Sequence, residues 1–365
     1  MGESWLALRN LPLTAFDLGL AAFDLGSTVS TLRLTVSNLR LTVSDLVASG
    51  AGYGVLLARN GRPAPIHLRA NREGFGVRLL ELKTILVATD LDEGSRPALA
   101  TARELAESAG AEVHVVHVSA DPDALETLAA KLADLGLEPE YTSLHVATGE
   151  ASHAINVLAD TIGVDAILIG PHRGRHRAEG RAVLGSTALA LATNAATPCL
   201  VATSVLRIPL QRTLVAVDIS DSARGTLAVA LSWTSALRTR GRDAAQSTRL
   251  TALHVARSRG QREQPPASND ELGRMIDRLR DDAGSWAGTP IESVSTENPD
   301  AAAGISDYAN THRADLVVLG TRGLGVDSVG RIGSVAASVM KRLDIPVLLV
   351  PPAVWAESAP QSPRH

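Results

Sequence analysis

Residues 84–90 read TILVATD and residues 213–218 read TLVAVD, two short runs of apolar and β-branched residues that both end on an aspartate. Such runs are typical of buried strands. The same series of segments follows each of them: EVHVVHV or RLTALHV, then DAILIG (165–170) or DLVVLG (315–320), and finally PCLVA or PVLLV. The chain therefore contains two copies of one unit.

Amphipathic segments of about ten to twenty residues separate these runs, which is the pattern of βαβ units and a parallel sheet. Strands as continuously apolar as DLVVLG indicate a sheet that is covered on both faces. We therefore predict an α/β fold of two doubly wound, five-stranded parallel-sheet (Rossmann-like) domains in tandem, at 81–206 and 207–352. The more polar third strands, at 142–148 and 290–297, are expected toward the sheet edges.

The first 80 residues depart from this pattern. From Leu13 to Val47 the sequence cycles every seven residues, with apolar residues spaced alternately three and four apart. This spacing suits an amphipathic or coiled-coil helix, whereas the many Thr, Val and Ser residues favour a poorly ordered low-complexity extension, and both interpretations stay open. Residues 48–80 are interpreted as a linker and residues 353–365 as a disordered tail.

Composition narrows the classes of function. The 365-residue chain is 45% hydrophobic and has a formal net charge of −4, so it offers no general basic field for nucleic acid. Its single cysteine, Cys199, lies in an apolar run, which predicts a buried structural thiol and suits a reducing compartment. Because no apolar stretch is long enough to span a bilayer, we expect a cytoplasmic protein without a membrane partner.

A glycine-rich stretch, LGTRGLGVDSVGRIGSV (319–335), follows the fourth strand of the second unit. In open parallel sheets, ligands bind beyond the carboxyl ends of the strands where the winding reverses, so Asp218 and Gly320 are expected to share one crevice. Glycines at 320 and 323 would admit a close ligand and a positive φ, and Gly333 opens a helix whose first turn suits an anion. A glycine-rich surface turn without a ligand is the competing interpretation.

Two better-known phosphate motifs do not fit this stretch. The sequence has no G-x-x-x-x-G-K-[ST] and hence no P-loop lysine, and G-x-G-x-x-G fails because Ser328 stands where the third glycine should be. Arg322 and Arg331 are the candidates for bidentate side-chain contacts with phosphate, against the alternative of ordinary solvent exposure.

The spacing of Gly320, Gly323 and Gly333 resembles the nucleotide loop in the ATP-binding branch of the universal stress proteins, and Asp218 and the His-Val pair at 254–255 match further positions of that family. The resemblance covers both units, about 81–352, as the tandem form of the family. It implies that Asp218 lies near the adenine and the ribose and that the backbone of Val255 contacts the adenine edge. It also implies a set of residues around ribose and phosphates: Gly320, Gly323, Gly333 and Ser334, with Val335 following on the helix.

The first unit departs from the family pattern. Its matching positions are Asp90, Val118, Gly170, Gly185 and Ser186. Its loop, however, is longer and carries several arginines, which either replace the charge that the altered backbone loses or form a solvated loop that binds nothing. We therefore expect weaker nucleotide binding, or none, in the first unit.

The resemblance implies an ATP-binding regulator of the stress response, with Mg as a candidate companion of ATP and a homodimer as a candidate assembly. It also implies that the two units pair through their fifth strands. A slow ATPase and a dimerisation or scaffold module without nucleotide are the alternatives. We assign no catalytic residue, and no metal site, because His172 and His176 lie in a glycine-broken loop. His254 is expected to be a hydrogen-bonded residue of its strand.

Overall fold

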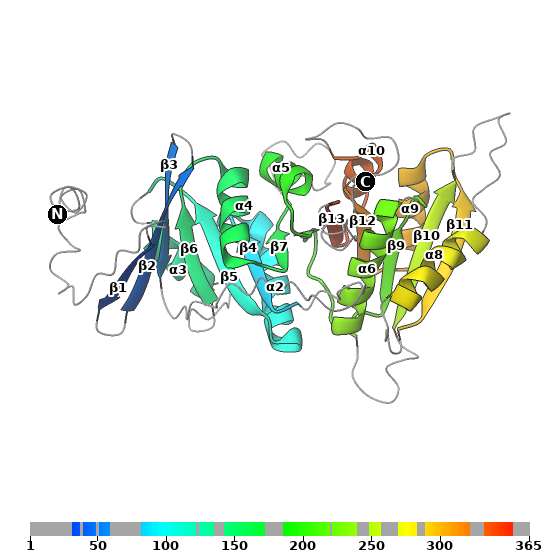
Figure 1. Ribbon diagram of the computed structural model, residues 1–365, viewed down its shortest axis with the longest axis horizontal. Helices are drawn as coiled ribbons and strands as arrows, with labels where there is room; N and C mark the ends of the chain where they lie inside the picture. The colour runs from blue at the N-terminus through cyan, green and yellow to red at the C-terminus, as the bar shows by residue number, and fades with distance from the viewer. Residues whose placement is uncertain are drawn as a thin grey trace, which may run out of the picture.

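The protein consists of two successive α/β units preceded by three strands (Figure 1). The structure is a computed structural model, and it describes residues 31–36, 39–48, 51–58, 82–121, 124–134, 142–171, 185–219, 221–238, 248–256, 269–282, 289–321 and 332–352.

The first unit is built on five strands: β4 (Thr84–Ala88), β5 (Glu112–Val118), β6 (Thr142–Ala147), β7 (Ala166–Ile169) and β8 (Cys199–Val201). They lie in the order β6-β5-β4-β7-β8, and each neighbouring pair is parallel. The apolar strand residues are buried because helices cover both faces, and Ile85, Leu86 and Val87 are each 0% exposed.

The helices of the first unit are α2 (Arg96–Ala109), α3 (Ala124–Asp134), α4 (Ala151–Ile162) and α5 (Ser186–Asn194). α2 and α3 pack against one face of the sheet, and α4 and α5 against the other. Two left-handed glycines, Gly110 and Gly163, end α2 and α4, because glycine adopts this conformation without a steric penalty.

The second unit repeats this plan with β9 (Arg212–Ala216), β10 (Arg249–Ala256), β11 (Ile291–Glu297), β12 (Leu316–Gly320) and β13 (Val347–Val350). The strand order is β13-β12-β9-β10-β11, and these pairs are also parallel. Its helices are α6 (Asp221–Ala236), α8 (Asn269–Asp282), α9 (Ala301–Thr311) and α10 (Ser334–Met340). α6 and α8 cover one face and α9 and α10 the other, as the doubly wound fold predicted.

The two units join through their fifth strands, as predicted. β8 pairs antiparallel with β13, which places Leu200 opposite Leu348 and Cys199 opposite Leu349. The sheet is therefore continuous through both units, and two apolar strands that would otherwise be edges cover each other (Figure 1). Complete burial raises the pKa of the Cys199 thiol to about 12, so this residue is the buried structural thiol that was expected.

The N-terminal segment differs from both expectations. It contains three antiparallel strands, β1 (Thr31–Val36), β2 (Leu39–Ala48) and β3 (Ala51–Ala58), in place of a heptad helix, and β3 occupies part of the expected linker. The repeat LRLTV also alternates apolar and polar residues, and its β-branched Thr and Val favour a strand over a helix. The other residues of 1–80, and the tail after Pro352, lie outside the described residues.

The N-terminal strands also correct one prediction about the edges. β3 pairs antiparallel with β6, with Val55 opposite Ala147, so the third strand of the first unit lies inside the sheet. β11 of the second unit does end the sheet, as predicted. The two third strands differ because the first has an additional partner that the repeat pattern does not encode.

Candidate functional site

The predicted site corresponds to the carboxyl edge of β9 and β12, which run side by side. Leu319 of β12 is opposite Ala216 of β9, so Gly320 and Asp218 follow at the same carboxyl edge of the sheet. The chain then leaves the two strands toward opposite faces, because α6 packs against one core and α10 against the other. Such a reversal is where ligands bind in open parallel sheets.

Asp218 is half-buried and begins a strained turn at the end of β9. The next residue, Ile219, has a φ of 46°, and Leu91, which follows Asp90 in the first unit, has a φ of 64°. A left-handed backbone at a non-glycine residue costs about 1–3 kcal/mol. The two units therefore share an unusual turn that directs the chain away directly after the strand-end aspartate.

The backbone of Val255 turns toward β9 at this edge of the sheet. The N–H of Val217 donates to the carbonyl of Leu253 (3.0 Å), and the N–H of Asn298 donates to the carbonyl of Ala256 (3.0 Å), so β10 turns alternate residues toward β9 and β11. By this alternation, Val255 turns its N–H and C=O toward β9, beyond the last residue with which β9 pairs to β10. An adenine edge needs one donor and one acceptor of this kind.

His254 lies beside Val255 and has the expected structural role. Its Nδ1 is 3.0 Å from the carbonyl oxygen of Val217, and His117 makes the same contact with Thr89 in the first unit at 2.9 Å. These bonds tie the carboxyl end of the second strand of each unit to the turn after the first strand.

The two ends of the glycine-rich loop meet above β12. The N–H of Gly333 donates to the carbonyl of Thr321 at 2.8 Å, and the N–H of Thr321 donates to Val350 at 2.9 Å. The exposed Ser334 then begins α10, and the half-buried Val335 packs against the core. The backbone thus brings Gly320, Gly333 and Ser334 to one place.

Two observations on this loop were not predicted. The described glycines with positive φ are Gly110, Gly149 and Gly163, so Gly320 does not adopt the positive φ that the sequence suggested. Thr321 is 2% exposed, and its hydroxyl has no hydrogen-bond partner among the described residues. No motif in the sequence marks Thr321 as a site residue, apart from its place directly after Gly320.

In the first unit, the strand-end aspartate is engaged by its own turn. The Ser95 hydroxyl donates to Asp90 Oδ1 at 2.7 Å, and the backbone N–H of Asp92 donates to the same oxygen at 3.1 Å. The corresponding position in the second unit, five residues after Asp218, is Ala223, which cannot make this bond. The contact between Ser95 and Asp90 therefore has no counterpart at Ala223.

Gly170 is needed for packing in the first unit. A Cβ at this position would lie 2.2 Å from the carbonyl oxygen of Gly94, which leaves no room for any side chain. Gly185 and Ser186 begin α5 as predicted, and Val118 packs partly buried at the end of β5. The close packing against Gly94 thus explains the glycine at position 170 without a ligand.

Several predicted residues lie outside the described residues. They are Arg322, Gly323 and Arg331 of the second loop, and the arginine-rich loop 172–184 with His172 and His176. Across the ranges that the structure describes, no group of three or more His, Cys, Asp or Glu residues could hold a metal ion.

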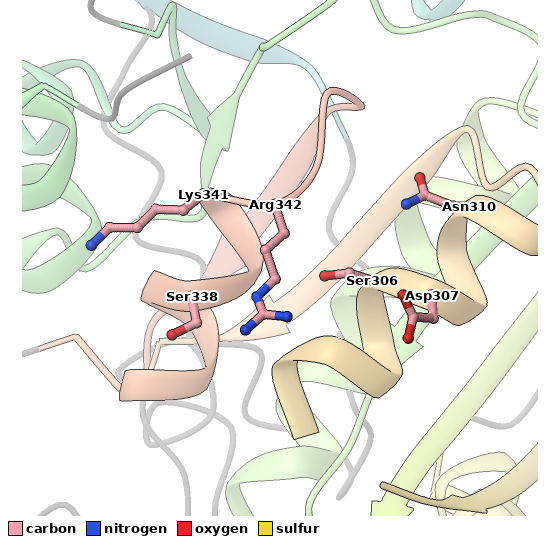
Figure 2. Close-up of a pocket in the computed structure, with 6 residues that line it drawn as sticks. All are labelled: Ser306, Asp307, Asn310, Ser338, Lys341 and Arg342. Carbon is pink, nitrogen blue, oxygen red and sulfur yellow. The ribbon is translucent and has the colours of Figure 1, made fainter. Parts of the chain in front are cut away.

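Two pockets lie away from the predicted residues. One, of about 500 Å³, lies between α9 and α10 and is lined by Ser306, Asp307, Asn310, Ser338, Lys341 and Arg342 (Figure 2). The other, of about 350 Å³, lies at the amino ends of β9 and β10 and includes Tyr308, whose ring stacks on His312 with 4.0 Å between centroids. No predicted site residue lines either pocket.

Comparisons with known proteins agree with the repeat. A model of the universal stress protein family matches residues 81–203 and again 209–351. The "universal stress protein in QAH/OAS sulfhydrylase 3'region" of Thermus aquaticus is 31% identical over 140 residues, which are 38% of this chain and 96% of that protein.

No helix in the described part of the chain has the length and apolar character needed to cross a membrane.

Two solved structures share the fold. A universal stress protein from Archaeoglobus fulgidus DSM 4304 has a TM-score of 0.53 at 19% identity, covering 74% of this chain and 98% of its own. A putative universal stress protein from Pseudomonas aeruginosa UCBPP-PA14 has a TM-score of 0.52 at 20% identity, covering 77% and 97%.

Proposed function

Because the chain belongs to the universal stress protein family and carries two family units in tandem, we propose that it is an ATP-binding regulator of the stress response. The nucleotide site that we propose lies in the second unit. In this role, occupancy by an adenine nucleotide changes a surface or an assembly of the protein, and no chemical step is required.

The observation that carries this proposal is that three neighbouring strands end at one edge of the sheet. Asp218 follows β9, the backbone of Val255 turns toward β9 from β10, and Gly320 ends β12. A carboxylate can accept hydrogen bonds from ribose hydroxyls, a backbone donor and acceptor suit the adenine edge, and a glycine leaves space for a phosphate. These are the roles that the family resemblance assigns to the same residues.

The proposed phosphate contacts complete the assignment. They are made by Gly320, Gly323, Gly333 and Ser334, with Arg322 and Arg331 as side-chain partners. A guanidinium pairs bidentately with phosphate oxygens and also offsets the charge of a triphosphate. Mg would reach the protein bound to ATP, and we assign it no ligand of its own.

We further propose that the first unit binds nucleotide weakly or not at all and serves mainly as the pairing partner of the second. The contact between Ser95 and Asp90 and the close approach of Gly94 to Gly170 support this view. A pairing module without nucleotide remains the second candidate function for this unit, because β8 and β13 join the two sheets directly.

Counting the bound nucleotide tests the proposal. Purified protein is denatured, and the released nucleotide is identified by chromatography and counted per chain, before and after incubation with ATP and Mg. We expect about one adenine nucleotide per chain. No release, together with no binding in calorimetry, would overturn the proposal and leave a pairing module, whereas phosphate release above that of a Gly333→Val control would favour a slow ATPase.

A further inference from the structure

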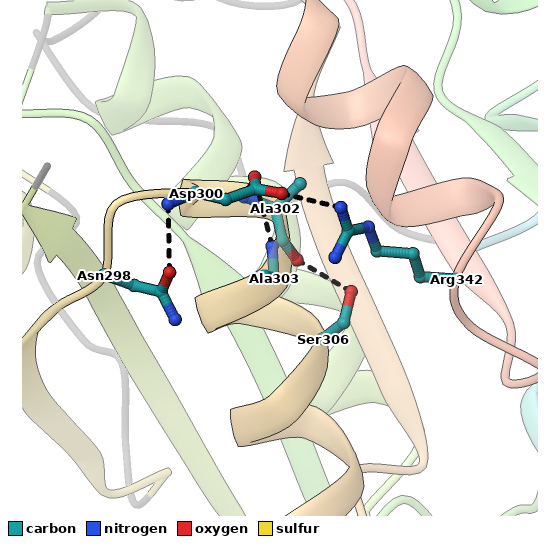
Figure 3. A network of polar contacts seen from close by, with 6 residues as sticks. All are labelled: Asn298, Asp300, Ala302, Ala303, Ser306 and Arg342. Atoms are coloured by element: carbon teal, nitrogen blue, oxygen red, sulfur yellow. Dashed lines mark hydrogen bonds and ion pairs between the residues drawn. The ribbon is translucent and has the colours of Figure 1, made fainter.

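We propose that Asp300 and Arg342 are positioning residues that hold the two halves of the second unit's nucleotide site in register. The inference rests on the proposed function, since it assigns the adenine half to β10 and the phosphate half to the end of the glycine-rich loop. Asn298, Asp300 and Arg342 form a chain of contacts between these halves, which we call the α9 clamp (Figure 3).

The first step of the clamp fixes the start of α9 to β10. The N–H of Asn298 donates to the carbonyl of Ala256, the residue after Val255, and Asn298 Oδ1 accepts from the N–H of Asp300 at 2.9 Å. Gly304 of α9 lies directly over this corner, where a Cβ would lie 2.9 Å from both Val255 Cγ1 and Asn298 Cβ. α9 therefore packs on Val255 with no space to spare.

In the second step, the two carboxylate oxygens of Asp300 accept hydrogen bonds from two different segments. Oδ1 accepts from the N–H groups of Ala302 (3.0 Å) and Ala303 (3.3 Å) and so caps α9, while Oδ2 accepts from the guanidinium of Arg342 at 2.6 Å. The bond from Ala303 and the charge of Arg342 both hold the pKa of Asp300 below its usual value, so the carboxylate is ionised at neutral pH.

The third step connects Arg342 with the glycine-rich loop. The N–H of Arg342 donates to the carbonyl of Val339 in the last turn of α10 (2.9 Å), and Val339 is fully buried against the core. α10 is only seven residues long and begins directly after Gly333. A constraint on one end of so short a helix also constrains the other end, where the loop closes on Thr321.

Among the residues that the structure describes, the first unit shows no ion pair of this kind. Glu150 caps α4 with bonds to the N–H groups of Ser152 (3.1 Å) and His153 (2.8 Å), and its second oxygen also accepts from the Ser152 hydroxyl. Nine residues after Gly185, where the second unit has Arg342, the sequence has Asn194. The clamp therefore occurs in the unit whose glycine spacing is intact, whereas the matching positions of the other unit, Glu150 and Asn194, cannot form an ion pair.

The clamp is exposed, and this limits the size of its effect. The side chains of Arg342 and Asp300 are 42% and 51% exposed, and Arg342 also lines the pocket between α9 and α10 (Figure 2). Ion pairs of this kind contribute little to folding, so we expect variants to remain folded with nearly unchanged melting temperatures. We expect at most about a fivefold change in affinity.

The test measures, by calorimetry on the full chain, the affinities of four single variants and of the double variant Arg342→Gln/Asp300→Asn for ATP and for adenosine. Arg342→Gln removes the ion pair, and Asp300→Asn removes the charge but keeps a good helix cap. Arg342→Lys restores a cation, and Lys341→Gln removes the neighbouring positive charge, which has no contact with Asp300 among the described residues. We expect Arg342→Gln and Asp300→Asn each to weaken ATP binding about three- to fivefold.

If Asp300 and Arg342 position the two halves of the site, we expect three further results. The double variant should be no weaker than either single variant, Arg342→Lys should recover part of the affinity, and adenosine affinity should change less than twofold because adenosine does not reach α10. Additive losses, or an equal loss in Lys341→Gln, would show general electrostatic attraction and overturn the inference. Wild-type protein that binds no ATP would instead overturn the proposed function itself.

Discussion

Ser95 donates a 2.7 Å hydrogen bond to Asp90, whereas the residue that stands in the same place relative to Asp218 is Ala223. The strand-end aspartate of the first unit is therefore held by its own turn. A ligand that needs the Asp90 carboxylate must compete with this serine hydroxyl.

The engaged carboxylate of Asp90 and the altered loop of the first unit predict one nucleotide per chain. Calorimetric titration with ATP should give a stoichiometry of about one. Asp218→Ala should weaken binding by roughly tenfold or more, since a hydrogen bond to a charged group contributes about 1.5–3 kcal/mol. Asp90→Ala is the matched control and should leave the titration unchanged. Two equivalent sites, or a loss with the Asp90 variant, would show that the first unit binds nucleotide too.

The tandem fold could be predicted from the sequence because its strands are continuous apolar runs that recur in the same order. The strands β1 to β3 could not, because LRLTV satisfies helical and strand periodicities at once and the choice depends on a partner strand, β6. Pairing between segments about ninety residues apart leaves no local trace in the sequence.

The same limit applies to the candidate site. Asp218, Val255 and Gly320 could be proposed because a parallel sheet brings the ends of its strands to one edge. The contact between Asp300 and Arg342, and the close approach of Gly304 to Val255, depend on how two helices pack on that sheet. Helix packing is decided by the shapes of many side chains, so no spacing rule in the sequence could have located these contacts.

The N-terminal strands predict a change in assembly when they are removed. A chain that begins at residue 81 keeps all five strands of each unit and should unfold cooperatively. It exposes the edge of β6, however, which offers unpaired backbone groups to another molecule. Light scattering should therefore detect more self-association than in the full chain at equal concentration. A truncated chain that is insoluble or lacks a thermal transition would show that this segment covers part of the core.

A buried histidine pair predicts acid sensitivity in the first unit. His114 Nδ1 lies 2.9 Å from His145 Nε2, and burial lowers the pKa of His145 from 6.5 to about 3. Burial also lowers the pKa of His114, despite the opposing effect of Glu112. The unfolded chain therefore binds more protons than the folded chain below pH 6.5, so the free energy of unfolding should fall as the pH falls, by up to about 1.4 kcal/mol per pH unit and proton.

The second unit supplies the variant for this test. At the positions of His114 and His145 it has Thr251 and Val294, so the double substitution His114→Thr/His145→Val imports a pair that already fits this fold. Urea unfolding at pH 5 and pH 7 should show a smaller difference in the double variant than in wild type. His153→Gln, on the exposed side of α4, is the control. An unchanged difference in the double variant would assign the acid sensitivity to other groups.

Two helical glycines predict opposite effects of the same substitution. A Cβ at Gly304 would lie 2.9 Å from Val255 Cγ1, whereas a Cβ at Gly273 in α8 would meet nothing within 4 Å. Gly304→Ala should therefore destabilise the protein by about 1–3 kcal/mol through overpacking and weaken ATP binding by displacing Val255. Gly273→Ala should stabilise it by about 0.5–1 kcal/mol, since alanine is the better helix former. Chemical denaturation measures both, and equal effects would contradict the close packing of α9.

The end of the glycine-rich loop gives the most direct test of phosphate binding. Gly333 has a φ of −59° and a ψ of 142°, a conformation that residues other than glycine also adopt. A valine at this position would therefore affect ATP binding by filling the space next to the backbone and not by straining the backbone. If phosphate approaches this backbone, Gly333→Val should lower ATP affinity more than Ser334→Ala, which removes one hydroxyl contact worth about 1.5–3 kcal/mol to a charged acceptor.

Adenosine distinguishes the two ends of the ligand in the same experiment. Ser334→Ala should leave adenosine binding unchanged because the nucleoside has no phosphate, whereas Asp218→Ala should weaken adenosine and ATP alike because its contacts are with the nucleoside. Affinities of the three variants for both ligands, with folding checked by circular dichroism, decide the matter. If Gly333→Val and Asp218→Ala fold and bind ATP as wild type does, then this crevice holds no nucleotide and the glycines serve the turn alone.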